Sequence, residues 1–214
     1  MKYYLFIVLG ISLSMSLKAQ IVKTSTVGGK RYSGYLSQKG FYLIKSRKDT
    51  VLQLKQADYF GFHFKDFNKD GYEDIYLEWT GNMPERYSLY LFVPSKGKFK
   101  ELKNFNNFPS AKQLAGTNYY YSYFPSGCAD DAWGSHLFYI KGYAAIKMAK
   151  IKGDGCGIDD GISIFKVMNN KENLVKRLPL NTINKYRDGK WGFIKSYWQK
   201  NYRFFLPSNG ANVK

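Results

Sequence analysis

The chain has 214 residues, with 33 Lys and Arg against 16 Asp and Glu, so its formal net charge is +17. This length suits one domain with a substantial core, and no apolar run in the chain reaches the roughly 20 residues that a membrane-spanning helix needs. The positive balance attracts anionic partners in general, whether glycans, membrane surfaces or nucleic acid.

The first 19 residues have the features of a secretory signal peptide. Lys2 gives a positive start, residues 3–15 are mostly apolar, and Ala19 places a small residue before the expected cut. No Cys lies near the cut to accept a lipid, and the apolar run is short for an anchor. We therefore expect a periplasmic or secreted protein of residues 20–214, and export argues against nucleic acid as its partner.

The following chain reads as short strands separated by Gly, Asn, Asp and Pro. Phe60, Phe62 and Phe64 recur at every second residue, which predicts that they share one face of a strand. The next strand repeats this alternation with Ile75, Leu77 and Trp79. Further predicted strands are residues 31–36, 41–45, 50–54, 88–93, 119–124, 135–141, 143–151 and 161–168. Together they predict a single all-β domain, an antiparallel β-sandwich or flattened barrel.

Between the two alternating strands lies the segment DFNKDGYED, residues 66–74, in which acidic and amide side chains surround Gly71. Calcium prefers six to eight oxygen ligands, and glycine permits the tight turn that gathers them. The predicted ligands are Asp66, Asn68, Asp70, Tyr72 through its carbonyl, and Asp74. An EF-hand is excluded, because its twelfth position is Leu77 and strands flank the loop. A metal-free hairpin turn is the alternative, and it would leave Asp66 and Asp74 unexplained.

Cys128 and Cys156 are the two cysteines of the chain. In an oxidising compartment an even count favours a disulfide, with two unrelated thiols as the alternative. A bridge would draw five neighbouring carboxylates to one end of the sheet: Asp130, Asp131, Asp154, Asp159 and Asp160. They predict a second cation site or a partner-facing patch, while ordinary turn-capping aspartates are the competing interpretation.

The C-terminal segment changes from the strand period to the helical period. Its apolar residues fall at intervals of three and four: Trp191, Ile194, Trp198, Tyr202 and Phe205. We expect a helix over about residues 190–205 that packs on the sheet. Residues 169–214 contain ten basic and two acidic residues. This helix would suit an anionic membrane surface, although a solvated lysine face is the simpler interpretation.

The calcium loop resembles those of integrin-type repeats, but it occurs once here. With its strands and the later Tyr-rich and Cys-containing segments, it makes residues 58–167 similar to a family of periplasmic immunity proteins. These proteins neutralise peptidoglycan-cleaving effectors and share a fold with the I-type lysozyme inhibitors. The resemblance implies a calcium-binding β fold and an exported enzyme as partner. The Ser-Gly-x-x-Tyr motif of those inhibitors is incomplete, because Ser37 and Asp130 stand where Tyr is required.

No catalytic residue is predicted. The sequence lacks a Gly-x-Ser-x-Gly elbow, a phosphate-binding glycine loop and a His pair at metalloprotease spacing. His63 and His136 are predicted to be structural or surface residues rather than general bases. The favoured function is an exported calcium-binding protein that inhibits a partner such as a peptidoglycan hydrolase. The alternatives are a cell-surface protein that binds anionic glycan or lipid, and a cell-wall hydrolase.

Overall fold

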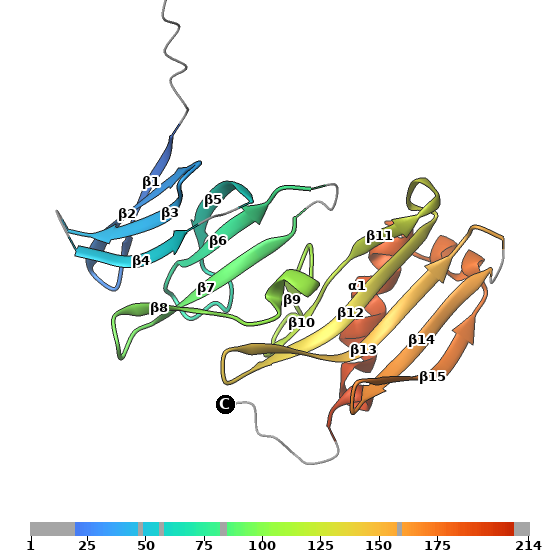
Figure 1. Ribbon diagram of the computed structural model, residues 1–214. Helices are drawn as coiled ribbons and strands as arrows, with labels where there is room; N and C mark the ends of the chain where they lie inside the picture. The colour runs from blue at the N-terminus through green and yellow to red at the C-terminus, as the bar shows by residue number, and fades with distance from the viewer. Residues whose placement is uncertain (1–19, 47–48, 56–57, 82–84, 158–159, 208–214) are drawn as a thin grey trace, which may run out of the picture.

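The computed structural model describes residues 20–46, 49–55, 58–81, 85–157 and 160–207, so the expected signal peptide lies outside the described residues. The described chain forms antiparallel sheets followed by one α-helix (Figure 1). Its strands are β1 (Ile21–Val27), β2 (Lys30–Ser37), β3 (Gly40–Lys45), β4 (Asp49–Lys55), β5 (Tyr59–Lys65), β6 (Asp74–Trp79), β7 (Tyr87–Val93), β8 (Lys98–Glu101), β9 (Lys112–Gln113), β10 (Tyr119–Tyr121), β11 (Phe124–Gly127), β12 (Ala132–Lys141), β13 (Ala144–Asp154), β14 (Gly161–Met168) and β15 (Lys171–Leu178).

Three open sheets make up the all-β fold, which confirms the predicted class in its sandwich form. The first sheet has the order β1-β2-β3-β4 and the second β5-β6-β7-β8. The third has seven strands in the order β15-β14-β13-β12-β10-β9, with β11 also paired to β12. Within the described ranges no sheet closes into a barrel.

The first two sheets pack face to face around an aromatic core. Tyr32 and Phe41 of the first sheet and Phe62 of the second are fully buried there, and the Phe41 and Phe62 rings meet edge to face at 5.0 Å. Gly34 lies directly over Phe62, since a side-chain carbon at this position would come within 2.5 Å of the ring. Each large side chain removed from water in this way stabilises the fold by roughly 1.5–3 kcal/mol.

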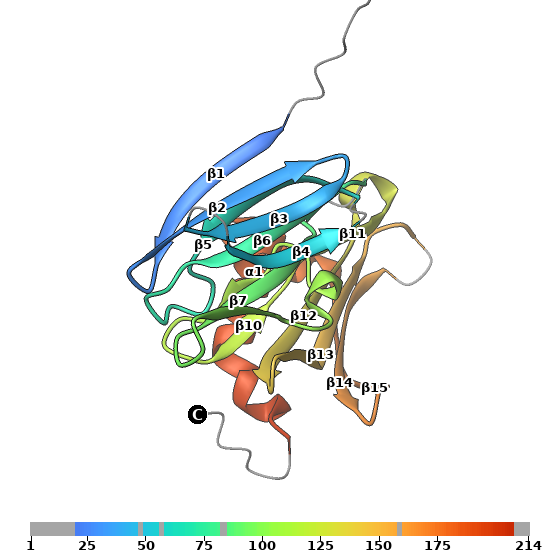
Figure 2. The ribbon, with the colours of Figure 1, turned by 60° about the vertical axis from the view of Figure 1, so that its left-hand side comes forward.

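The second sheet is also covered on its opposite face, where it meets the third sheet. Tyr76 of β6 and Leu89 of β7 pack there with Phe105, Tyr120 and Phe138 in a separate core. The middle sheet is therefore buried on both sides, and Figures 1 and 2 show it between the first and third sheets. This explains why β7 is buried at nearly every residue rather than at every second one.

The predicted C-terminal helix is confirmed. It comprises α1 (Gly189–Asn201) and the 3-10 turn η4 (Tyr202–Phe205), and it covers the remaining face of the third sheet (Figure 1). Ile194 and Trp198 are buried, and the Trp198 Nε1 donates a hydrogen bond to the Ser135 Oγ on β12 at 2.8 Å. Trp191 departs from the prediction, because it is 48% exposed and packs on Tyr123 instead.

Two further features differ from the sequence prediction. Phe60 is 59% exposed rather than buried with Phe62, because the pairing of β5 with β6 shifts between Tyr59 and Gly61 and turns Phe60 away from the core. Strands β1, β8, β9 and β11 and the edge strand β15 were not predicted. Most residues of β15 are exposed and the strand carries no alternating pattern. Its pairing with β14 places it in the sheet.

Candidate functional site

The acidic loop connects β5 to β6, and its carboxylates fold the loop around themselves. Asp66 accepts hydrogen bonds from the backbone N–H groups of Asp70 (3.3 Å) and Gly71 (2.9 Å). Asp70 in turn accepts from the Tyr72 N–H and from the Asn68 side-chain amide, both at 2.9 Å. Gly71 has φ +89°, a conformation that favours glycine and permits the turn.

Asp74 anchors the end of the loop in the protein interior. Its side chain is fully buried and accepts backbone N–H bonds from Phe67 and Phe92, both at 2.9 Å. The pKa of Asp74 is raised to about 7, mainly by burial and also by the negative charges of Asp70 and Asp66, while the two N–H bonds act to lower it. Asp66, Asp70 and Asp74 are thus close enough for their charges to repel.

The loop offers the hard oxygen ligands that calcium takes, but carboxylates alone would not complete a site. Within the described residues, no three His, Cys, Asp or Glu side chains are gathered closely enough to hold a metal ion by themselves. A bound calcium would therefore need the Asn68 amide oxygen and the Tyr72 carbonyl as well. The Asn68 amide now donates from its nitrogen to the Asp70 carboxylate at 2.9 Å and accepts the Asp70 backbone N–H at its oxygen at 3.3 Å, so a bound calcium would replace these bonds.

The predicted Cys128–Cys156 disulfide is present and brings the two acidic loops together. Lysines neutralise part of their charge. Asp130 accepts a bond from the Lys190 Nζ at 2.6 Å and another from the Tyr123 hydroxyl. Although burial opposes it, these bonds hold the pKa of Asp130 below its ordinary value.

The other carboxylates of this group do not form a common site. Asp154 pairs with Lys152 at 3.0 Å, and Asp160 accepts the Gly157 N–H at 3.0 Å. Asp131 is exposed, and Asp159 lies outside the described residues. The two loops joined by the disulfide thus form a polar edge whose carboxylates bond to neighbouring residues. A role of this edge as a second cation site or partner-facing patch remains a prediction.

The two histidines occupy different environments. His63 on β5 approaches the Glu78 carboxylate at 3.1 Å and stacks on Tyr76 with 4.6 Å between ring centroids. Burial lowers the pKa of His63 while Glu78 opposes this effect. His136 lies on the third sheet, in a cleft that the sequence did not reveal.

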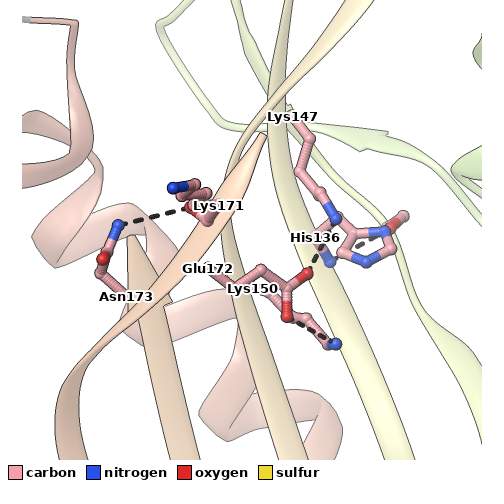
Figure 3. A network of polar contacts seen from close by, with 7 residues as sticks. His136, Lys147, Lys150, Lys171, Glu172 and Asn173 are labelled. Atoms are coloured by element: carbon pink, nitrogen blue, oxygen red, sulfur yellow. Dashed lines mark hydrogen bonds and ion pairs between the residues drawn. The ribbon is translucent and has the colours of Figure 1, made fainter. Parts of the chain in front are cut away.

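The His136 ring lies beside a cationic network on the face of the third sheet opposite α1. Figure 3 shows Glu172 of β15 between Lys147 and Lys150 of β13, and both lysines approach its carboxylate at 2.9 Å. The pKa of His136 is lowered to about 4, mainly by burial and also by the charges of the two lysines. The Asn107 carbonyl, which accepts a hydrogen bond from the ring, and the Glu172 carboxylate act in the opposite direction.

The cleft around His136 has a volume of about 720 Å³ and lies where the segment after β8 meets β12 and β13. Arg86 and Lys147 are its cationic residues, and none of the described residues that line it is acidic. Four asparagines and two phenylalanines make up much of its remaining wall: Asn104, Asn106, Asn107, Asn170, Phe108 and Phe124. These residues come from distant parts of the chain. The only local sign was the run of lysines on β13, which includes Lys147, Lys150 and Lys152.

The chain matches no protein-family model and no curated protein. Among solved structures it is similar to a Xanthomonas type IV secretion system related protein, with 15% identity and a TM-score of 0.49 over 75% of this chain and 95% of that one. At this level the similarity supports no statement about function. Every helix in the described ranges is too short or too polar to span a bilayer.

Proposed function

We propose that this chain is an exported calcium-binding protein that binds and inhibits a partner protein such as a peptidoglycan hydrolase. The observation that carries the calcium part is the acidic loop, where Asp66 and Asp70 act electrostatically on the buried Asp74. A cation would relieve this repulsion. It would also bind the carboxylates that, without it, accept hydrogen bonds from the backbone N–H groups of the loop.

Calcium bound here would stabilise the region where two cores meet. Asp74 is the first residue of β6, and this strand contributes Ile75 to the first core and Tyr76 to the second. Next to the loop, the Ser25 hydroxyl donates to Glu73 and ties the loop to β1. A calcium ion would supply positive charge and coordination, while the β strands would hold the ligands in place.

Inhibition of an exported enzyme is supported by the resemblance of residues 58–167 to periplasmic immunity proteins. A disulfide-bonded, multi-sheet scaffold suits a protein that presents rigid loops to a partner. The exposed Asp131 and Asp160 at the disulfide edge would contribute negative charge toward basic enzymes despite the positive charge of the whole chain. The two histidines have structural contacts in the fold, which favours binding over general-base catalysis.

Calcium binding is tested by thermal unfolding of residues 20–214 after chelator treatment. At a calcium concentration 100 times Kd, binding would stabilise the protein by about 2.7 kcal/mol and raise Tm by about 5–10 °C. Asp70→Ala should abolish this rise, whereas Asp58→Ala, which removes an exposed acid outside the loop, should retain it. An unchanged Tm of the unmutated protein in millimolar calcium would contradict the calcium site.

The partner is tested by capture from envelope and secreted fractions of the producing organism, with calcium present. We expect a muramidase or amidase whose activity falls stoichiometrically as the protein is added. Release of soluble fragments from peptidoglycan by the protein alone would instead make it the hydrolase. Binding to anionic glycan or lipid that weakens steeply with salt would favour the surface-binding alternative, for which the exposed Lys195, Lys200 and Arg203 near the C-terminal helix provide charge.

A further inference from the structure

The cleft around His136 has the dimensions and composition of a small-molecule site. Its volume of about 720 Å³ falls within the roughly 300–1,000 Å³ that is usual for such sites. It lies between the second and third sheets, and its lining includes no residue of the acidic loop and none of the acidic residues at the disulfide edge. Its residues therefore belong to neither feature on which the proposed function rests.

Arg86 is fixed in position at one side of this cleft. Its Nε donates to the Asn106 carbonyl at 3.2 Å, and its guanidinium lies 5.6 Å from the centre of the Trp79 ring. In the described part of the chain no carboxylate pairs with it. A guanidinium held in this way offers its remaining N–H groups, in a fixed plane, to a carboxylate.

Lys147 supplies a second positive charge that its surroundings only partly neutralise. Lys147 and Lys150 share the single carboxylate of Glu172 (Figure 3), so this group of three carries a net positive charge. Lys147 lines the cleft together with Arg86. The electrostatic preference of the cleft is therefore for an anion.

The remaining lining residues suit a ligand that carries amide or hydroxyl groups beside its charge. The four asparagine side chains each provide donors and an acceptor, while Phe108 and Phe124 provide apolar surface. The His136 Nδ1 is buried and has no hydrogen-bond partner among the described residues. An acceptor in this state costs about 1–3 kcal/mol unless a water molecule or a ligand supplies a donor.

We propose that this cleft binds a small carboxylate that also carries amide and hydroxyl groups, of the class of N-acylated sugar acids. Arg86 and Lys147 would bind the carboxylate, and the asparagines would bind the amide and hydroxyl groups. The phenylalanines would contact the apolar face of the ring. This inference does not rest on calcium binding or on inhibition of an enzyme.

The test compares N-acetylmuramic acid with N-acetylglucosamine, a neutral sugar that lacks the lactyl carboxylate. Calorimetry at low salt and NMR of the His136 ring would measure binding to the full mature chain. We expect saturable binding of the acid, at least about tenfold weaker binding of the neutral sugar, and a rise in the pKa of His136 when the acid is bound.

Variants separate the cleft from the general positive charge of the protein. Arg86→Gln and Lys147→Gln should each weaken binding of the acid at least about tenfold. Lys152→Gln is the matched control, because Lys152 lies on the same strand but pairs with Asp154 outside the cleft. Circular dichroism would verify that each variant is folded.

Three results would overturn the proposal. The first is equal binding of the acid and the neutral sugar, and the second is an equal loss of binding in Lys147→Gln and Lys152→Gln. The third is the absence of saturable binding up to about 10 mM, above the millimolar affinity expected of a weak small ligand. The calcium and hydrolase assays are independent of all three, so failure here leaves the proposed function standing.

Discussion

Acidification is expected to destabilise the protein through His136. Its pKa is about 4 in the folded protein and near the ordinary 6.5 in the unfolded chain, because burial and the charges of Lys147 and Lys150 disfavour the protonated ring. The unfolded chain thus gains a proton below about pH 6.5 that the folded protein gains only near pH 4. The contribution of His136 to stability must therefore fall as the pH falls through this window, while the raised pKa of the Asp74 carboxyl acts in the opposite direction. Proton linkage gives a loss of about 2 kcal/mol between pH 7.5 and 5, and about 3 kcal/mol below pH 4.

Urea unfolding of the unmutated protein and of His136→Gln, followed by tryptophan fluorescence at pH 7.5 and 5, measures this effect. Other carboxylates also respond to acid: Asp130 and Asp154, whose pKa is lowered in the folded state, lose stabilisation, and Asp74, whose pKa is raised, gains it. These groups are common to both proteins. The loss of unfolding free energy on acidification should therefore be about 2 kcal/mol smaller in the variant. Equal losses in the two proteins would refute the assignment of a buried, neutral His136.

Two further predictions concern the third sheet and its loops. Trp198→Phe should lower the unfolding free energy by about 2–4 kcal/mol, because it removes buried volume and leaves the buried Ser135 hydroxyl without its 2.8 Å partner. Urea unfolding measures this loss, and a value below about 1 kcal/mol would contradict the packing of α1. The Cys128–Cys156 bridge joins residues 28 apart in the sequence, so its reduction should lower the unfolding free energy by about 3–4 kcal/mol in the chain-entropy description. An unchanged Tm in reductant would contradict this stabilising role.

Several elements follow from short-range patterns that the sequence displays directly. The alternation of Ile75 and Leu77 predicts a strand with one apolar face, and the spacing of Ile194 and Trp198 predicts the helix that covers the third sheet. Gly71 marks the turn of the acidic loop, and it has the positive φ that this turn requires. These features were predictable because the backbone periods of strands and helices, and the conformational freedom of glycine, depend on neighbouring residues alone.

Other features depend on how the three sheets pack, and no local pattern contains that information. Tyr76 is buried beside Ile75 although they point to opposite faces, because a sheet on each side excludes water from both. The exposure of Phe60 results from a register shift against β6. The His136 cleft combines Arg86 with Lys147, which are far apart in the chain and become neighbours only when the second sheet meets the third. Such contacts arise from long-range packing of surfaces, so only the tertiary structure could bring these side chains into one site.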